Sequence, residues 1–279
     1  MTIWNAIILG LVQGIAEFLP ISSSGHLSVL QNLFHMSTAE DGHMFFDVLL
    51  HLGTLISICI VYWRDIVKMF RETIQFFRDM KKPAAERQQQ QLPAARMVLM
   101  IIVATLPLFV ILPINDYVEQ LYYHTIFIGV AFALTGCLLF VSDRMPTGKR
   151  TEKNMRVKDA LIIGVCQAIA TIPGLSRSGT TITAGMATGL NRDFAVKFSF
   201  MMSLPAVLGA NILSLAKAAK AGIDVSLLPA YLIGMVVAMV SGVFAIGLVK
   251  RITSKGKFGN FAYYCWGVAG LTIILSLIF

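Results

Sequence analysis

Charged side chains are scarce in this sequence. Asp, Glu, Lys and Arg make up 14% of its 279 residues, whereas soluble domains contain about 25%. Hydrophobic residues make up 56%, and the mean hydropathy is +0.73. Such a chain cannot cover itself with a water-soluble surface. The composition therefore predicts an all-α polytopic membrane protein, since helices satisfy their own backbone hydrogen bonds in lipid.

Cysteine is also rare, and no typical secretion signal opens the chain. The four cysteines lie in apolar segments without metal-ligand spacing, which argues for buried thiols and against a disulfide framework. The first residues lack a basic n-region and an Ala-x-Ala-like cleavage site, so we expect them to remain in the mature protein. The cysteines are Cys59, Cys137, Cys166 and Cys265.

Acidic residues are the minority among the charges. The chain has 23 Lys and Arg against 15 Asp and Glu, a formal net charge of +8, and the basic residues gather between apolar segments. Basic loops of membrane proteins stay in the cytoplasm, where they face anionic lipid. We interpret the excess as a consequence of membrane topology, with membrane lipids as partners and no nucleic-acid partner.

Six apolar segments approach the roughly 20 residues that a spanning helix needs. Two further apolar segments, 4–19 and 159–172, are too short and end at Pro20 and Pro173. Proline ends or kinks a helix because it lacks an N–H group and restricts the residue before it. The first part of the polar stretch 64–96 is predicted to form an amphipathic helix on the membrane surface. The six predicted spans are 45–63, 97–113, 125–141, 198–216, 228–249 and 261–279.

Polar residues interrupt the first short segment. Residues 13–26 read Gln-Gly-Ile-Ala-Glu-Phe-Leu-Pro-Ile-Ser-Ser-Ser-Gly-His. After Pro20, serine hydroxyls can cap the free N–H groups of a new helix. The stretch 4–34 therefore predicts a half-helix, a polar tip and a second half-helix. A helix N-terminus with free N–H groups and hydroxyls is a natural anion site.

A related broken helix occupies residues 159–190, and its polar part aligns with the first copy without a gap. One copy holds an acid, an imidazole and hydroxyls, while the other holds a fixed cation, so we expect the two tips to share one site. The matching pairs include Gln13 with Gln167, Ser22 with Ser176, Ser24 with Ser178 and Gly25 with Gly179, whereas Glu17, Ser23 and His26 correspond to Thr171, Arg177 and Thr180.

The distribution of charge orients the chain. The loops 64–96, 142–158 and 250–257 are basic and predicted to be cytoplasmic, while the connections 31–44 and 114–124 are acidic and predicted to lie outside. This arrangement requires each broken helix to enter and leave the membrane on the same side. The first would dip in from outside and the second from the cytoplasm, with both termini outside.

The architecture that follows is a pair of inverted-topology repeats, each a re-entrant helical hairpin plus three transmembrane helices. The first repeat spans 1–141 with its hairpin at 4–34, and the second spans 159–279 with its hairpin at 159–190. The basic segment 142–158 is the predicted cytoplasmic linker. Irregular backbone at membrane depth survives only inside protein or around a wet cavity, so we expect the tips to meet within the bundle.

The first tip carries the candidate reactive groups. Glu17 at membrane depth is a functional candidate, although a structural hydrogen bond to the other tip would also explain it. Ser23 and His26 are three residues apart and share a helical face. Hydroxyl, imidazole and carboxylate together are the components of an activated nucleophile. The alternatives are that the serines Ser22, Ser23 and Ser24 only cap the helix and that His26 only packs.

The second tip and the first span carry the remaining candidates. Arg177 with its neighbouring hydroxyls is suited to bind phosphate, because a guanidinium binds two oxygens at once. Asp47 and His51 lie four residues apart on the first span, and they either line the cavity or pair with each other. The hydroxyls around Arg177 belong to Ser176, Ser178, Thr180 and Thr181.

These residues give the chain its resemblance to the undecaprenyl pyrophosphate phosphatases, also called the bacitracin-resistance family. The family's first motif is Glu or Gln, three residues, Glu, and then Phe-Leu-Pro-x-Ser-Ser-x-Gly-His, which here runs from Gln13 to His26. Its second, Pro-Gly-x-Ser-Arg-Ser followed by two residues and Thr, runs from Pro173 to Thr181. Both are matched in full, and the resemblance covers essentially the whole chain. Gln13 in place of Glu removes one candidate metal ligand.

The resemblance implies a phosphatase that converts undecaprenyl diphosphate to undecaprenyl phosphate at the outer face of the bacterial plasma membrane, supported by a divalent cation such as Mg²⁺ or Ca²⁺. It implies that Ser23 is the nucleophile, that Glu17 and His26 supply acid–base or metal help, and that Arg177 holds the diphosphate. A metal-activated water or His26 as the attacking group stays open. The candidate phosphate-binding side chains are Gln13, Ser22, Ser24, Ser176, Ser178 and Thr181.

Another class of protein would fit the same architecture. Inverted repeats with broken helices that meet at the midplane are typical of secondary transporters. On that interpretation the protein flips a lipid phosphate or moves a small anion, and the polar groups only bind it. The oligomeric state stays open, with a homodimer among the options.

Overall fold

A computed structural model describes residues 1–34, 44–81, 92–221 and 224–278 of the chain, and the part that it describes is helical apart from loops and one isolated bridge between Arg150 and Leu190. The predicted acidic connection after residue 34 and the glutamine-rich part of the 64–96 stretch lie outside the described residues. The α-helices are α1 (Ile3–Ala16), α2 (Ser23–Phe34), α3 (Met44–Val61), α4 (Trp63–Met80), α5 (Pro93–Thr105), α6 (Asn115–Gln120), α7 (Thr125–Ser142), α8 (Val157–Ile169), α9 (Arg177–Ala187), α10 (Arg192–Ala221), α11 (Leu228–Ser254) and α12 (Phe261–Ile278). Short 3₁₀ segments are η3 (Leu106–Val110), η4 (Leu112–Ile114), η5 (Leu121–Tyr123), η6 (Val225–Leu227) and η7 (Phe258–Asn260).

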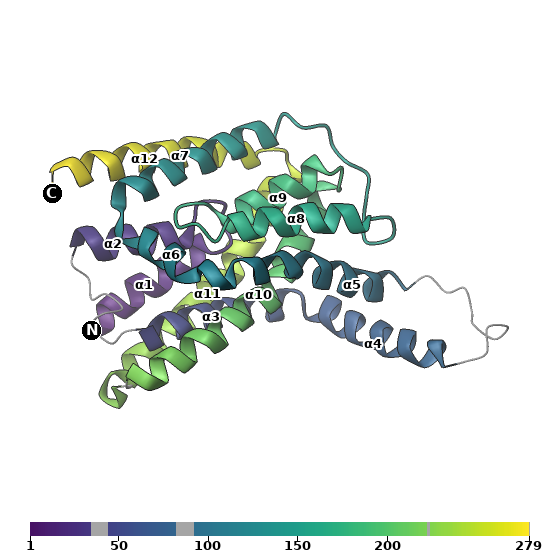
Figure 1. Ribbon diagram of the computed structural model, residues 1–279, viewed down its shortest axis with the longest axis horizontal. Helices are drawn as coiled ribbons and strands as arrows, with labels where there is room; N and C mark the ends of the chain where they lie inside the picture. Colours follow the sequence, from purple (N-terminus) through teal and green to yellow (C-terminus); the bar gives the residue numbers. More distant parts are fainter. Residues whose placement is uncertain (35–43, 82–91, 222–223, 279) are drawn as a thin grey trace.

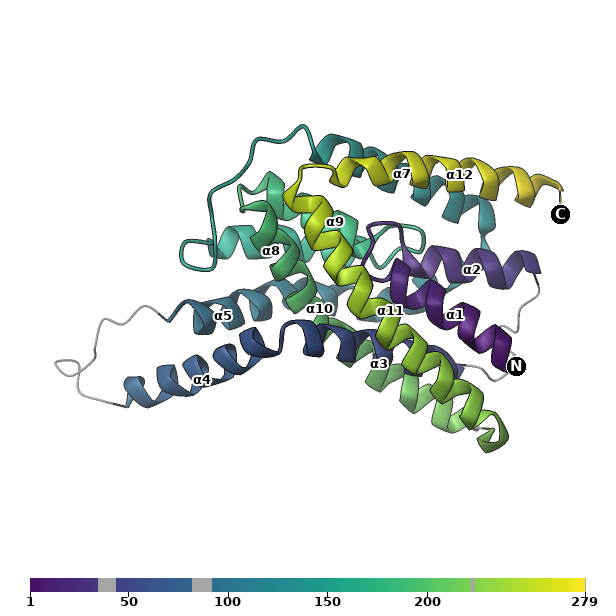
Figure 2. The same cartoon turned by 180° about the vertical axis from the view of Figure 1, so that it is seen from behind.

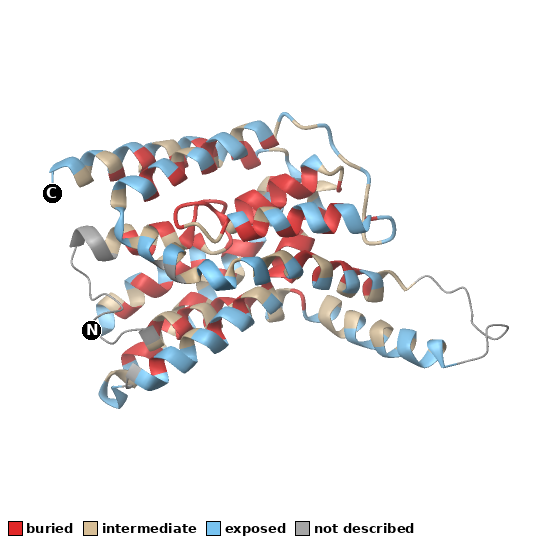
Figure 3. Cartoon of the chain, in the orientation of Figure 1, coloured by how far each residue is buried: buried red, intermediate tan, exposed pale blue. Residues whose placement is uncertain are grey.

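Five helical stretches of the described chain are long and apolar enough to cross a membrane, and the bent pair α3–α4, with an angle of 77° at the break, makes a sixth candidate. Large apolar side chains such as Phe244 and Leu277 are exposed along these helices, and buried residues concentrate in the middle of the molecule (Figure 3). The prediction of an all-α polytopic membrane protein is therefore confirmed. The five stretches are Pro93–Ile114, Thr125–Ser142, Arg192–Lys220, Val225–Ser254 and Phe258–Ile278.

Two helical hairpins enter the bundle from opposite ends. In Figure 1, α1 and α2 run in and back from the end that holds both termini, whereas α8 and α9 do so from the other end. Figure 2 shows from behind the same approach of the two tips in the middle of the molecule. The half-helices α1 and α8 end at Ala16 and Ile169, four residues before Pro20 and Pro173, because proline has no N–H to donate to the carbonyl oxygen four residues earlier. The division of the chain into two inverted repeats stays a prediction.

Helix α4 is the predicted amphipathic helix, although its place on the membrane surface stays a prediction. None of its side chains is buried. Two carboxylates attach it to the bundle: Asp65 accepts a hydrogen bond from Lys197 at 2.5 Å, and Glu72 accepts one from the backbone N–H of Ala94 at 2.6 Å. These contacts fix α4 beside the beginning of α5 and α10.

Glycines let α11 pack closely against α1 and α3. A β-carbon at Gly10 would lie 2.5 Å from the carbonyl oxygen of Gly234, and one at Gly53 would overlap the carbonyl oxygen of Met235. Small residues at such positions allow helices to approach by their backbones in a membrane, where packing replaces the hydrophobic effect. The bundle around α11 is therefore intolerant of added volume at these positions.

We expect Gly53→Ala to destabilise the protein by about 1–3 kcal/mol, the usual cost of overpacking a well-packed contact. Gly267→Ala on α12 is the matched control, because a β-carbon there meets no atom within 4 Å and alanine favours helix by about 0.5–1 kcal/mol over glycine. Thermal unfolding in detergent measures both. Equal melting temperatures for the two variants would contradict close packing at Gly53.

Candidate active site

Each hairpin tip is built around a serine that caps the returning helix. The Ser22 hydroxyl accepts a hydrogen bond from the backbone N–H of Gly25 at 3.2 Å, and the Ser176 hydroxyl accepts one from Gly179 at 3.1 Å. Ser22 also has a φ of 66°, a left-handed conformation that is strained for a residue with a side chain. In this conformation Ser22 and Ser176, both expected to bind phosphate, are buried helix caps.

The two tips touch each other directly. The Ser178 hydroxyl, on the second tip, donates to the carbonyl oxygen of Leu19 on the first at 3.1 Å. Thr135 of α7 holds the second tip from behind, since its hydroxyl donates to the carbonyl oxygen of Gly174 and accepts from the N–H of Ser176, each at 3.1 Å. The structure thus brings together the two polar motifs that lie more than a hundred residues apart in the sequence.

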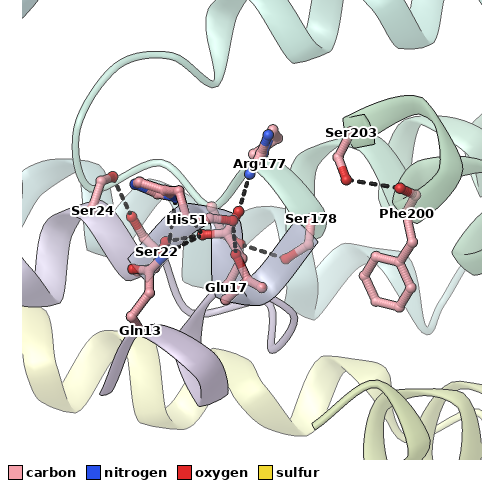
Figure 4. A network of polar contacts seen from close by, with 12 residues as sticks. Gln13, Glu17, Ser22, Ser24, His51, Arg177, Ser178, Phe200 and Ser203 are labelled. Carbon is pink, nitrogen blue, oxygen red and sulfur yellow. Dashed lines mark hydrogen bonds and ion pairs between the residues drawn. The ribbon is translucent and has the colours of Figure 1, made fainter. Parts of the chain in front are cut away.

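Glu17 is the centre of the polar network at this junction (Figure 4). One carboxylate oxygen accepts hydrogen bonds from the Ser23 hydroxyl at 2.7 Å and from the Gln13 amide at 3.0 Å. The other oxygen forms an ion pair with the guanidinium of Arg177. The Glu17 side chain is 6% exposed and that of Arg177 is 27% exposed. A buried carboxylate is thus compensated by a cation that reaches a more open position.

His51 joins this network through Gln13. Its Nδ1 lies 2.9 Å from the Gln13 amide nitrogen and 3.9 Å from the Glu17 carboxylate. Because that amide nitrogen faces both the carboxylate and the imidazole, the Gln13 Oε1 points elsewhere and is buried without a partner in the described chain. Of the two interpretations left open for His51, the structure places it at the site. The four-residue spacing of Asp47 and His51 could not show which side chain His51 would contact.

His26 is held by groups other than Ser23 and Glu17. Its Nδ1 donates to the carbonyl oxygen of Ser22 at 2.7 Å, and its Nε2 lies 2.8 Å from the hydroxyl of Tyr264. The ring stacks on Tyr264 at an angle of 13° and meets the Phe132 ring edge-on at 5.0 Å between centroids. Tyr264 is a site residue that the sequence did not indicate, because it lies in the last span and no motif surrounds it.

Of the remaining candidate hydroxyls, those of Thr181 and Ser24 have protein partners, whereas that of Thr180 is buried without one in the described chain. Thr181 donates to the carbonyl oxygen of Arg177 at 2.8 Å and lies 2.6 Å from the Ser199 hydroxyl. The Ser24 hydroxyl lies 3.4 Å from that of Ser22. Among the serines of the first tip, only Ser23 contacts a carboxylate, so its hydroxyl is the one placed to lose a proton to a neighbouring base.

The site offers few metal ligands of its own. The described residues contain no group of three or more His, Cys, Asp or Glu side chains that could hold a metal ion. Glu17 supplies its carboxylate donor, whereas the buried Oε1 of Gln13 points away from Glu17. Mg²⁺ is usually held by one or two carboxylates together with substrate phosphates. The donor set therefore fits an ion that arrives with a phosphorylated ligand.

Comparison with known proteins places these residues in a family. Residues 6–271 match the family model described as Bacitracin resistance protein BacA. An undecaprenyl-diphosphatase of Methanosphaera stadtmanae is 37% identical over 281 residues, covering 100% of this chain and 99% of the relative. Undecaprenyl-diphosphatases of Alkaliphilus metalliredigens and Carboxydothermus hydrogenoformans are 40% and 37% identical, with 100% and 99% of this chain and 100% and 97% of the relatives covered. The chain belongs to the bacitracin resistance protein family.

Proposed function

We propose that this membrane protein hydrolyses undecaprenyl diphosphate to undecaprenyl phosphate and inorganic phosphate. The activity recycles the lipid carrier of cell-wall synthesis and confers bacitracin resistance. The observation that carries the proposal is Glu17, which contacts the Ser23 hydroxyl on its own tip and the Arg177 guanidinium on the other. A nucleophile, a base and a phosphate-binding cation thus converge on one point, and relatives that match over the whole chain are named for this reaction.

The first chemical step uses the hydrogen bond between Ser23 and Glu17. The Ser23 oxygen attacks the terminal phosphorus while its proton passes to the Glu17 carboxylate, 2.7 Å away. A bond forms between the serine oxygen and phosphorus, and the bond between phosphorus and the bridging oxygen breaks. Undecaprenyl phosphate leaves with the electron pair of that bond. Water then attacks phosphorus and gives its proton to a site base, while the bond between phosphorus and the serine oxygen breaks. Glu17 returns its proton to the Ser23 oxygen, and phosphate is released.

Arg177 binds the diphosphate during both steps. Phosphoryl transfer depends mainly on positioning and charge neutralisation, and a planar guanidinium can hold two phosphate oxygens. The arginine exchanges its contact with Glu17 for the phosphate as the substrate enters, which leaves the carboxylate free to accept the serine proton. His26, whose Nε2 contacts the Tyr264 hydroxyl, is the second acid–base group of this proposal.

A divalent cation, Mg²⁺ or Ca²⁺, completes this proposal. Glu17 would hold it together with phosphate oxygens of the substrate. When bound, it neutralises part of the charge on the transferring phosphoryl group. With a single acidic ligand in the protein, we expect metal affinity to rise strongly when the diphosphate is present.

The site serves the outer face of the plasma membrane in this proposal, with both chain termini outside. Two observations support it. The loops rich in Lys and Arg are separated along the chain from the acidic connections, and Figure 1 places both termini at one end of the bundle. The isoprenoid tail would then lie in lipid beside the apolar outer helices.

The decisive experiment uses purified protein in detergent, without a membrane gradient. We expect it to release phosphate from a polyprenyl diphosphate when Mg²⁺ is added and to leave the polyprenyl monophosphate in the organic phase. A chelator should stop the release. Binding of the lipid without phosphate release, in protein that is folded by thermal unfolding, would instead favour a transporter or flippase.

A further inference from the structure

Helix α12 delivers one tyrosine to the first hairpin tip. The Cys265 thiol lies 3.7 Å from the carbonyl oxygen of Pro20, so α12 packs against the tip itself. The preceding residue, Tyr264, places its hydroxyl 2.8 Å from the Nε2 of His26 and stacks its ring on the imidazole. The last helix of the chain thus contacts a candidate acid–base group of the first motif.

The hydrogen bonds of His26 determine where its proton lies. A carbonyl oxygen can only accept, so the Nδ1 that contacts the Ser22 carbonyl oxygen at 2.7 Å carries a hydrogen. In the neutral ring the Nε2 is then an acceptor, and the Tyr264 hydroxyl donates to it. The imidazole is thereby held in a single tautomer, with the edge of Phe132 at 5.0 Å completing its surroundings.

The same arrangement accommodates a protonated imidazole. A hydroxyl can donate or accept, so when the Nε2 gains a proton, it donates to the Tyr264 oxygen and the hydroxyl hydrogen turns away. Tyr264 is 46% exposed, which leaves its hydroxyl room to find another acceptor. No movement of the histidine ring is needed. A phenylalanine would keep the stacking but would offer the Nε2 no partner in either state.

We propose that Tyr264 is a positioning residue that holds the His26 ring in its orientation and bonds to its Nε2 in both protonation states, while the Ser22 carbonyl oxygen fixes the Nδ1–H tautomer. This proposal rests on the proposed function in one respect, which is that His26 acts as an acid–base group during phosphate release. The pairing itself is a property of the two side chains, and it can be measured in the absence of substrate.

The test compares Tyr264→Phe with Tyr263→Phe in full-length protein in detergent micelles. Tyr263 is the adjacent, 64% exposed tyrosine of α12, and its ring meets Trp266 edge-on instead of the site. We expect Tyr264→Phe to lower kcat by about 10- to 100-fold, part of the 10²–10⁴ that general acid–base catalysis contributes, with KM changed less than about twofold. Tyr263→Phe should leave both constants unchanged.

Two further measurements separate positioning from a general loss of structure. The nitrogen-15 spectrum of labelled histidine should show Nδ1 of His26 protonated in both proteins, and the Nε2 resonance should shift in Tyr264→Phe because that nitrogen loses its hydrogen-bond partner. In a His26→Ala background, Tyr264→Phe should have no additional effect on kcat, since residues acting as a unit are not additive. The proposal is overturned if Tyr264→Phe leaves the Nε2 resonance of His26 unchanged, or if its effect on kcat persists in full without His26.

Failure of the proposed function can be distinguished from failure of the role proposed for Tyr264. If the wild type releases no phosphate from a polyprenyl diphosphate, the proposed function fails, and the histidine spectra still decide whether Tyr264 bonds to the Nε2 of His26. If the wild type is active and Tyr264→Phe matches it in kcat, only the role of Tyr264 fails.

Discussion

Ser23→Ala is expected to lower kcat by roughly 10³- to 10⁶-fold, the range found when a catalytic nucleophile is removed. The Ser23 hydroxyl is the one hydroxyl of the first tip bonded to the Glu17 carboxylate, at 2.7 Å, and alanine leaves no oxygen there to attack phosphorus. Phosphate release from a polyprenyl diphosphate measures the loss. Ser28→Ala, on the same helix and outside the polar network, is the control and should retain activity.

The chemistry of the intermediate distinguishes the three candidate nucleophiles. A phosphoserine survives acid, whereas a phosphohistidine does not, so rapid quenching in acid followed by intact mass spectrometry should find a phosphorylated wild-type protein. Ser23→Ala should show no such adduct. An adduct that vanishes in acid would assign the attack to His26. Full turnover without any adduct would assign it to water and remove the serine from the mechanism.

The sequence was sufficient to predict that the two polar tips would meet. Pro20 and Pro173 end half-helices that are too short to span the membrane. The gapless alignment of the two motifs identified them as the tips of two related re-entrant hairpins. Because irregular backbone in a membrane must be buried in protein, the tips had to meet. The ion pair between Glu17 and Arg177 shows that the tips do meet, although the sequence did not indicate that these two side chains would pair.

Other features depended on details of tertiary register that no local pattern contains. Ser22 and Ser176 carry hydroxyls beside an anion-binding motif, yet these hydroxyls cap helices. Sharing a helical face with Ser23 was not enough to bond His26 to it, because a tyrosine from α12 and the backbone of Ser22 take up both ring nitrogens. Such contacts depend on how α12 is rotated and shifted against the tip, which hydropathy does not determine.

Removing the guanidinium of Arg177 is expected to impair both activity and folding. Arg177→Ala should lower kcat/KM by about 10³- to 10⁵-fold, the contribution of an arginine that neutralises a transferring phosphoryl group. It should also destabilise the protein by about 3–5 kcal/mol, because the Glu17 carboxylate, 6% exposed, would stay buried without its cation. Phosphate release and thermal unfolding in detergent measure the two effects.

A second substitution separates the two roles of this arginine. In Glu17→Gln with Arg177→Ala, no buried charge is left unpaired, so we expect the melting temperature to recover towards the wild type while activity stays lost. Arg144→Ala is the control for loss of a cation, since Arg144 is exposed and packs over the Phe140 ring away from the tips. If the double variant stayed as unstable as Arg177→Ala, the buried carboxylate would not be what Arg177 stabilises. If Arg177→Ala remained active, the diphosphate would have to be held by another group.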